Sequence, residues 1–148
     1  MFKAVFTKDT PESLGALAKL LSALIGREVE SVTIIANEPP IDNLHDRQIR
    51  FDIQCKSPDG TYFNVELSMN PDEFEPVRLE YYEGKLFTGQ DIRGSGKTYN
   101  DLQEAYQIAF LANRRFFADE DFFHRFEYYD RVRDISFGGR TRIITIEL

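Results

Sequence analysis

The stretch that most restricts how this chain can fold is 48–69, QIRFDIQCKSPDGTYFNVELSM. On either side of a turn-forming SPDG sequence, apolar and polar side chains alternate with period two, as they do in strands with one buried face. Pro58 presets the first turn position, and Gly60 can take the left-handed conformation that closes a three-residue loop with a G1 bulge. The stretch therefore predicts an antiparallel hairpin at the centre of the fold. Its apolar face comprises Ile49, Phe51, Ile53, Cys55, Phe63, Val65, Leu67 and Met69.

The three-residue loop also fixes which residues face each other across the hairpin. Counting back from it pairs Gln54 with Asn64, and the next pair on the same face places Asp52 opposite Glu66. Like charges in directly opposed positions destabilise a hairpin unless something binds between them, and a divalent cation is the natural candidate. A four-residue turn would shift the pairing by one and remove this juxtaposition. The alternative is two solvent-facing acids on an ordinary hairpin, which the spacing alone favours slightly.

Length and composition indicate one domain. With 148 residues, of which 42% are hydrophobic, the chain can bury a sizeable core but is too short for two comfortable domains. We therefore expect a single domain over 1–148, and a predicted strand that stops at Leu148 suggests a domain trimmed from a longer chain. No apolar run is long enough to span a bilayer, and the N-terminus lacks the apolar segment of a signal peptide. The single cysteine, Cys55, excludes an intrachain disulfide and is interpreted as a core residue, so we expect a cytoplasmic protein with no membrane partner.

The net charge of −7, from 25 acidic and 18 basic residues, excludes a protein that binds nucleic acid through bulk positive charge. It does not exclude a nuclease, because a metal ion supplies positive charge locally and only one face needs to be basic. Arginines at 114–115, 131 and 133 lie among aromatic residues, a mixture that some nucleic-acid-binding proteins use. Acidic residues are interspersed in the same stretch, so a solvated, salt-bridged face is the better interpretation.

Two helices are expected beside the hairpin. The first begins at Thr10 and Pro11, continues through a leucine-rich stripe at helical spacing and ends at Gly26. The second is predicted to begin at 70–73, NPDE, where asparagine is the N-cap, proline the first helical residue and glutamate the end of a capping box. The buried edge of this second helix is expected at Phe74, Val77 and Tyr81.

The remaining segments complete the expected architecture. Short β-branched or apolar runs predict strands at 29–36, 106–112 and 142–148. Loops are expected at 37–46 and at 89–101, which is glycine-rich, and 113–134 is expected to be a loop followed by a helix. Together these elements predict an α/β fold, a mixed β-sheet with a central antiparallel hairpin flanked by helices.

Three familiar kinds of site are rejected. The sequence Gly96-Lys97-Thr98 invites comparison with a phosphate-binding loop, but the first glycine of that motif would fall at Asp91, and a helix rather than a strand precedes it. Neither His45 nor His124 has a metal-ligand spacing, and no serine lies in the sequence context of a nucleophile elbow. The acid pair is what remains. Hard oxygen ligands on adjacent strands suit Mg²⁺ or Mn²⁺, which activates water and stabilises charge on a phosphate under attack.

At this point the chain resembles a known family. RFDI, a DG turn and NVELS are similar to the motif of the PD-(D/E)xK nuclease superfamily, and more narrowly to the PD-(D/E)xK nuclease family transposases, which are related to recombination-promoting nucleases. Similar features follow in order over nearly the whole chain: Phe2, Lys3, Phe6, the leucine-rich helix, Arg78, Tyr81, Tyr82, Lys85, Leu86, Tyr99 and the strand at Tyr106. The resemblance implies a restriction-endonuclease-like core, a divalent metal and hydrolysis of phosphodiesters in DNA. By position, it makes Asp52 and Glu66 the metal-binding acids.

Ser68 departs from the pattern of the group. Its members carry lysine, or commonly glutamine, two residues after the second acid, where the side chain positions the attacking water. Serine is short and uncharged, so it can at most hold a water through hydrogen bonds. Either Gln54, Lys85 or Arg78 substitutes for it, or catalysis is weak or lost. The acid that begins the N-terminal motif of the group is also missing.

The leading hypothesis is a divalent-metal-dependent DNA endonuclease-like domain of a transposase or recombination-promoting protein. Its metal ligands would be Asp52 and Glu66, its water-orienting residue Ser68 or Gln54, and its contacts to DNA phosphate Arg78, Lys85 and Lys97. The alternative is a catalytically inactive family member that serves as a DNA-binding or protein-interaction module. A purely structural domain with solvated acids is a third hypothesis. DNA is the expected partner, and homo-oligomerisation is left open.

Overall fold

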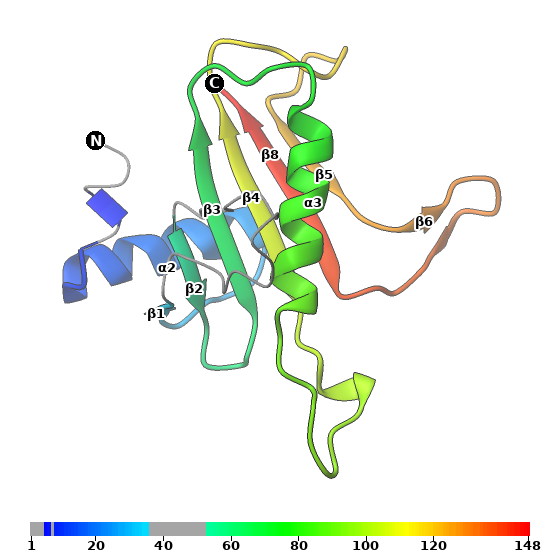
Figure 1. Cartoon of the computed structure of the whole chain (residues 1–148). Coiled ribbons are helices and arrows are strands. Elements are labelled where there is room, and N and C mark those ends of the chain that lie inside the picture. The colour runs from blue at the N-terminus through cyan, green and yellow to red at the C-terminus, as the bar shows by residue number, and fades with distance from the viewer. Residues whose placement is uncertain (1–4, 7, 36–52) are drawn as a thin grey trace, which may run out of the picture.

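The computed structural model describes residues 5–6, 8–35 and 53–148 and shows an α/β fold built on a mixed six-stranded sheet (Figure 1). In spatial order the strands are β1 (Thr33–Ile34), β2 (Ile53–Lys56), β3 (Tyr62–Ser68), β4 (Ala105–Leu111), β8 (Thr141–Glu147) and β5 (Phe123–Phe126). The central strands β3, β4 and β8 are parallel, and the other pairings are antiparallel. Helices α2 (Pro11–Ile25) and α3 (Glu75–Thr88) lie on opposite faces of the sheet. The predicted fold class is confirmed.

Strands β2 and β3 form the predicted hairpin with the predicted register. Gln54 faces Asn64 across the pair. The Ser57 N–H donates to the Thr61 carbonyl at 3.0 Å, the Gly60 N–H donates to the Ser57 carbonyl at 3.0 Å, and Gly60 has φ 95°. This is the G1-bulge loop that the turn sequence predicted, and glycine is required in it because a side chain disfavours that φ.

Part of the predicted hairpin lies outside the described residues. The structure gives no account of 36–52, so Asp52, its pairing with Glu66, and His45 are not placed by it. Met69, expected on the apolar face of the second strand, instead follows the end of β3 and is exposed.

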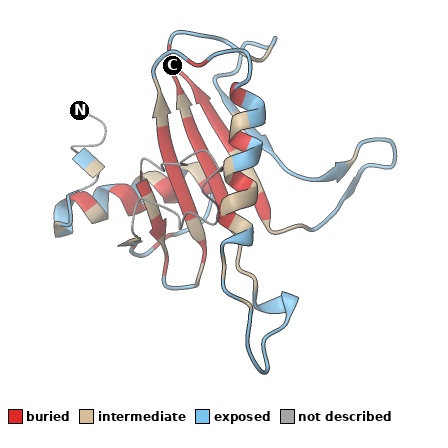
Figure 2. Cartoon of the chain, viewed as in Figure 1, coloured by how far each residue is buried: buried red, intermediate tan, exposed pale blue. Residues whose placement is uncertain are grey.

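Helix α2 and the sheet face that it covers form the larger hydrophobic core (Figure 2). The Thr10 side chain caps the helix by accepting from the Ser13 N–H at 3.3 Å, and Gly26 ends it with φ 73°, both as predicted. Cys55 is fully buried in this core, and burial raises the pKa of its thiol to about 12, as expected for a structural cysteine rather than a reactive one. The core is made of Leu17, Ala18, Leu21, Ile25, Val29, Val32, Ile53, Cys55, Phe63, Val65, Tyr106, Ile108, Ile144 and Ile146.

Helix α3 joins β3 to β4 across the opposite face, and two predictions about it were wrong. It begins at Glu75 rather than at 71, because the Asp72 carboxylate accepts from the Phe74 N–H at 2.8 Å and holds a turn ahead of the helix. Its buried stripe is not the predicted edge of Phe74, Val77 and Tyr81, which are all exposed. The residues that face the sheet are Glu75, Leu79, Glu83 and Leu86.

The segment 113–134, predicted to contain a helix, contains none in the structure. Its centre is β5, which hydrogen-bonds along the outer edge of β8 and pairs Phe123 with Ile146. Beyond β5 the chain forms a projecting two-stranded ribbon of β6 (Tyr129–Asp130) and β7 (Ile135–Ser136) (Figure 1). The partner strand is distant in sequence, so local composition gave no sign of it.

The other predicted elements are close to those observed. Strands β4 and β8 lie within one residue of the predicted 106–112 and 142–148, whereas 29–36 contributes only the short β1. The glycine-rich loop follows α3 and includes the 3₁₀ turn η1 (Tyr99–Asp101). Within the described ranges, no helix is long and apolar enough to cross a membrane.

Candidate functional site

Glu66 lies near the carboxyl end of β3, on the sheet face that α3 covers. Only 3% of its surface is exposed, so it is not the solvent-facing acid of the alternative interpretation. Its neighbour across the parallel pair is Ala109, whose small side chain leaves room beside the carboxylate for groups from α3. A carboxylate this buried needs a charged or hydrogen-bonding partner.

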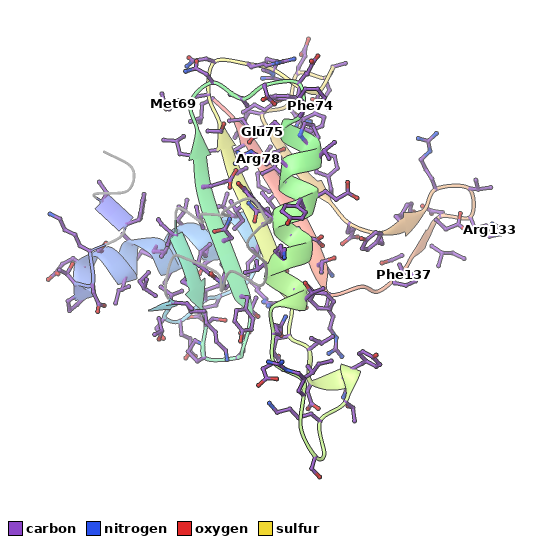
Figure 3. All side chains as sticks on the ribbon, in the orientation of Figure 1. Met69, Phe74, Glu75, Arg78, Arg133 and Phe137 are labelled. Carbon is purple, nitrogen blue, oxygen red and sulfur yellow. The ribbon has the colours of Figure 1, made fainter. Side chains whose placement is uncertain are left out.

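That partner is Arg78, which projects from the first turns of α3. Its Nη2 donates to Glu66 Oε1 at 2.7 Å and also to Glu75, and its Nε donates to Glu75 Oε2 at 3.2 Å. The guanidinium also lies over the Tyr82 ring, 5.1 Å from its centroid. Figure 3 shows Glu75 and Arg78 together near the start of the helix. One cation therefore joins two buried carboxylates.

The surroundings of Arg78 shift its pKa in opposite directions. Burial lowers it, but the hydrogen bond with Glu75 and the charge of Glu66 outweigh burial and hold the pKa above the usual value for arginine. The guanidinium stays charged at any pH at which the protein is folded. It is the fixed positive charge of this site.

A polar hollow of about 380 Å³ opens beside this cluster. Ser68 lines it together with Glu66, so the structure brings the predicted second acid and the departing serine into one site. Its lining is rich in oxygen atoms, the type of ligand that Mg²⁺ and Mn²⁺ prefer. The residues around it are Glu66, Leu67, Ser68, Met69, Asn70, Asp72, Glu75 and Arg78.

Gln54 lies on the same sheet face as Glu66, on β2, the strand that pairs with β3. Opposite Gln54 on β3, the fully buried Asn64 donates through Nδ2 to Oε1 of Gln107 on β4 at 2.9 Å. Neither Asn64 Oδ1 nor Gln107 Nε2 makes a hydrogen bond to a described residue. A row of amide side chains thus crosses β2, β3 and β4 next to Glu66.

The two predicted lysine contacts are not part of the hollow. Lys85 is in the last turn of α3, with its Nζ 5.8 Å from the centroid of the Tyr81 ring. Lys97 is exposed in the loop that follows α3 and donates to the Asp91 carbonyl at 3.1 Å. That loop lies at the end of the sheet opposite to the carboxyl end of β3 (Figure 1). Of the three predicted phosphate contacts, only Arg78 adjoins Glu66.

Glu75 is the site residue that the sequence analysis missed. It lies on the buried stripe of α3 and shares Arg78 with Glu66. The signal was present as an acid three residues before an arginine in a helix, a spacing that brings the two side chains together. Among the described residues, no three histidine, cysteine, aspartate or glutamate side chains form a metal-binding cluster, and Asp52 lies outside them.

Comparison with known proteins gives the family of the chain. A family model for the PD-(D/E)XK nuclease family transposases matches residues 1–148, the whole chain. The chain belongs to this family. Its superfamily typically uses divalent metals, and the family supports a nuclease-like domain. Neither the search of curated proteins nor the search of solved structures found a match.

Proposed function

We propose that residues 1–148 form a divalent-metal-dependent DNA endonuclease-like domain of a transposase or recombination-promoting protein. The observation that carries the proposal is the buried carboxylate of Glu66 beside an oxygen-lined hollow, in a chain of a nuclease family. The preferred ion is Mg²⁺ or Mn²⁺, because the lining offers carboxylate, amide and hydroxyl oxygens and no sulfur donor besides Met69. The proposal also places the domain in the cytoplasm and makes DNA its partner.

The roles of the residues follow from where their side chains lie. Glu66 would hold the ion together with Asp52. Glu75 contacts the same guanidinium as Glu66, so its carboxylate would be a further ligand. A bound divalent ion would activate water and offset charge on a DNA phosphate. Ser68 can orient a water from the floor of the hollow, and Gln54 is the second candidate for that task.

Arg78 would act differently from the lysines. Since its guanidinium is engaged by two carboxylates, it holds Glu66 in place and leaves about a third of its side chain exposed to a phosphate. Lys85 and Lys97 lie towards the far end of α3, so they would contact the DNA backbone away from the bond being cleaved. Such contacts position DNA without reading its sequence.

One observation favours a second candidate, an inactive family member that binds DNA or protein. Arg78 already pairs with both Glu66 and Glu75, so each acid has a cationic partner without a metal ion. With Ser68 in the position of the usual lysine or glutamine, such a member would keep the fold and lose hydrolysis.

Plasmid cleavage separates the two candidates. We expect Mg²⁺- or Mn²⁺-dependent nicking by the wild type, lowered at least about 100-fold in Glu66→Gln, because even outer-shell partners of a metal contribute about 10- to 100-fold. Glu12→Gln on α2 is the matched control and should retain activity.

Equal and negligible cleavage by the wild type and Glu66→Gln would rule out catalysis. Calorimetry with Mn²⁺ then tests the metal site alone. Micromolar binding that is lost in Asp52→Ala and Glu66→Gln supports the site, and the absence of binding in the wild type leaves the inactive module.

A further inference from the structure

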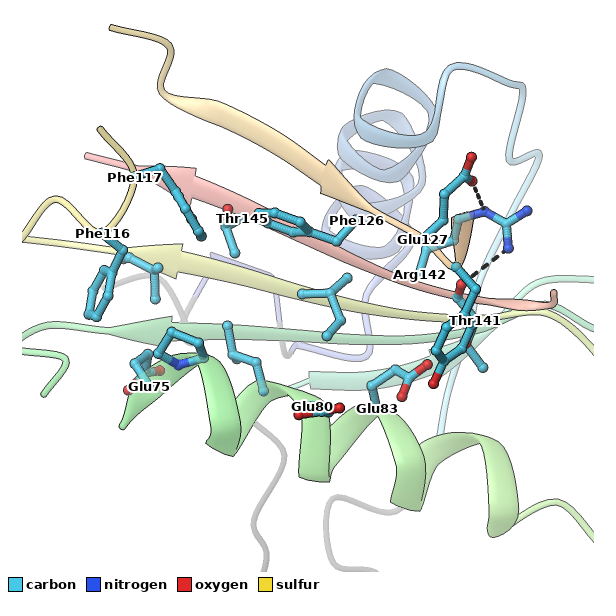
Figure 4. Close-up of a pocket in the computed structure, with 15 residues that line it drawn as sticks. Glu75, Glu80, Glu83, Phe116, Phe117, Phe126, Glu127, Thr141, Arg142 and Thr145 are labelled. Carbon is cyan, nitrogen blue, oxygen red and sulfur yellow. Dashed lines mark hydrogen bonds and ion pairs between the residues drawn. The ribbon is translucent and has the colours of Figure 1, made fainter. Parts of the chain in front are cut away.

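A second pocket, which shares only Glu75 with the polar hollow, lies between α3 and the strands β8 and β5 (Figure 4). Its volume is about 260 Å³, and most of its wall is apolar or aromatic. The apolar residues that line it are Pro76, Leu79, Leu111, Phe116, Phe117, Phe126, Tyr128 and Ile143. Four glutamates also line it: Glu75, Glu80, Glu83 and Glu127.

Two polar side chains of this pocket are buried without a partner. Glu83 is 7% exposed, and in the described part of the chain its carboxylate makes no hydrogen bond or ion pair. Thr145 is 1% exposed, and its Oγ1 makes no hydrogen bond within the described ranges. By contrast, Glu127 is paired with Arg142 at 3.1 Å. The Glu83 oxygens are not among the fully buried side-chain atoms that lack a partner, so the carboxylate reaches the pocket opening. A carboxylate beside a mostly apolar wall suits a cation on an apolar stem.

The ribbon beside the pocket supplies the complementary surface. We call residues 127–140 the β6–β7 arm; it projects from the body of the protein (Figures 1 and 3). An isolated two-stranded ribbon is marginally stable, and this one exposes much apolar surface. The exposed apolar side chains of the arm are Tyr128, Tyr129, Val132, Ile135 and Phe137.

At the tip of the arm, an exposed apolar side chain lies next in sequence to an arginine that has no partner among the described residues. Val132, at the turn between β6 and β7, is 89% exposed. Arg133 pairs with Asp130 at 3.1 Å, whereas Arg131 makes no hydrogen bond or ion pair to any described residue. The pocket has its own cation in Arg142, but that arginine is paired with Glu127, and the tip presents a further cation beside an apolar group.

We propose that two copies of this chain form a symmetric dimer by exchanging β6–β7 arms, with Arg131 of each arm paired to Glu83 in the pocket of the other copy. Glu127 and Tyr128 line the pocket, so it lies at the base of the arm. Two arms that lie side by side and antiparallel place each tip at the base of the other. A twofold axis makes both contacts identical, as in most homodimers.

Charge argues for a protein partner rather than DNA on this arm. Within 127–140, the acids Glu127, Asp130 and Asp134 balance the arginines Arg131, Arg133 and Arg140. A DNA-binding arm gains its affinity from excess positive charge, which is absent here. Exposed tyrosine, phenylalanine and arginine are instead typical of protein interfaces.

Sedimentation velocity on the full chain tests the proposal with reversed charges. Glu83→Arg and Arg131→Glu should each raise the dimer dissociation constant at least about tenfold, because each homodimer then opposes like charges twice. An equimolar mixture of the two variants should restore a dimer, since both contacts of the heterodimer again pair opposite charges. Arg93→Glu, on the exposed loop after α3, is the matched control and should not change assembly.

Several results would overturn the proposal. A monomeric wild type at all concentrations does so, and so does a dimer that Arg131→Glu leaves unchanged. If Glu83→Arg does not fold, the exposed tip variants Arg131→Glu and Val132→Asp decide the question alone, since neither side chain supports the fold. Weaker duplex binding by Arg131→Glu, with assembly unchanged, would assign the arm to DNA instead.

Discussion

The two faces of the central sheet are made of alternate residues of the same strands, yet they differ in kind. On the α2 side, Phe63, Val65 and Ile108 are fully buried among apolar neighbours. On the α3 side, the next residues along β3 are Asn64 and Glu66, equally buried but polar. Burial of apolar surface stabilises a fold, whereas buried polar groups at best recover their lost hydration. The α2 face therefore contributes more to stability than the α3 face, where the polar residues of the candidate site lie.

The largest effect should come from the apolar face. Phe63→Ala removes a fully buried ring that stacks on Tyr106 with centroids 5.5 Å apart, and should cost about 3–5 kcal/mol of unfolding free energy. Phe74→Ala, on a side chain 65% exposed, is the matched control and should change stability by less than about 0.5 kcal/mol. Urea unfolding measures both. Equal losses would mean that α3 buries the edge first predicted from its sequence.

On the polar face, Arg78→Met should show how much the buried acids lower the free energy of unfolding when they lack a cation. It leaves Glu66 and Glu75 without their shared cation, and we expect a loss of about 2–3 kcal/mol at pH 7, less than for a fully buried pair because Arg78 is partly exposed. Arg93→Met, at an exposed site, should have little effect. Unchanged stability in Arg78→Met would show that the two acids do not depend on this cation.

The pKa of the Cys55 thiol tests whether water reaches the apolar face of the sheet. Burial raises its pKa in the folded protein from 9.0 to about 12, so the native state binds the proton more tightly than the unfolded chain does. The stabilisation is complete below pH 9.0 and is lost as pH rises towards 12. At a pH about one unit above the unfolded value, wild type should have lost about 1 kcal/mol more than Cys55→Ala, relative to neutral pH. Parallel loss in both proteins would mean that the thiolate reaches water.

The hairpin was predictable because its determinants are local. The Pro58-Asp59-Gly60 loop sets the register, and the structure pairs Gln54 with Asn64 as the turn requires. The first helix was predictable for the same reason, since Thr10 and Gly26 mark both its ends.

The face of α3 could not be predicted in the same way. Its sequence contains two stripes at helical spacing, and the more apolar one, with Phe74 and Tyr81, is exposed. The buried stripe contains Glu75 and Glu83, whose burial depends on Arg78 in one case and on a pocket in the other. The spacing of Glu75 and Arg78 is visible in the sequence, but their joint contact with Glu66 and the pocket around Glu83 appear only in the tertiary structure.

Because Arg78 pairs with Glu66 and Glu75, folding of the chain does not depend on the metal binding proposed for this site. A dissolved ion must be captured from the surroundings, but a guanidinium on the same chain reaches Glu66 and Glu75 at the effective concentration set by a short helical tether. The chain can therefore complete its fold before any ion arrives. Addition of a chelator should leave the folded protein intact, and under the proposed function an ion would enter a site in which Arg78 already holds Glu66 and Glu75.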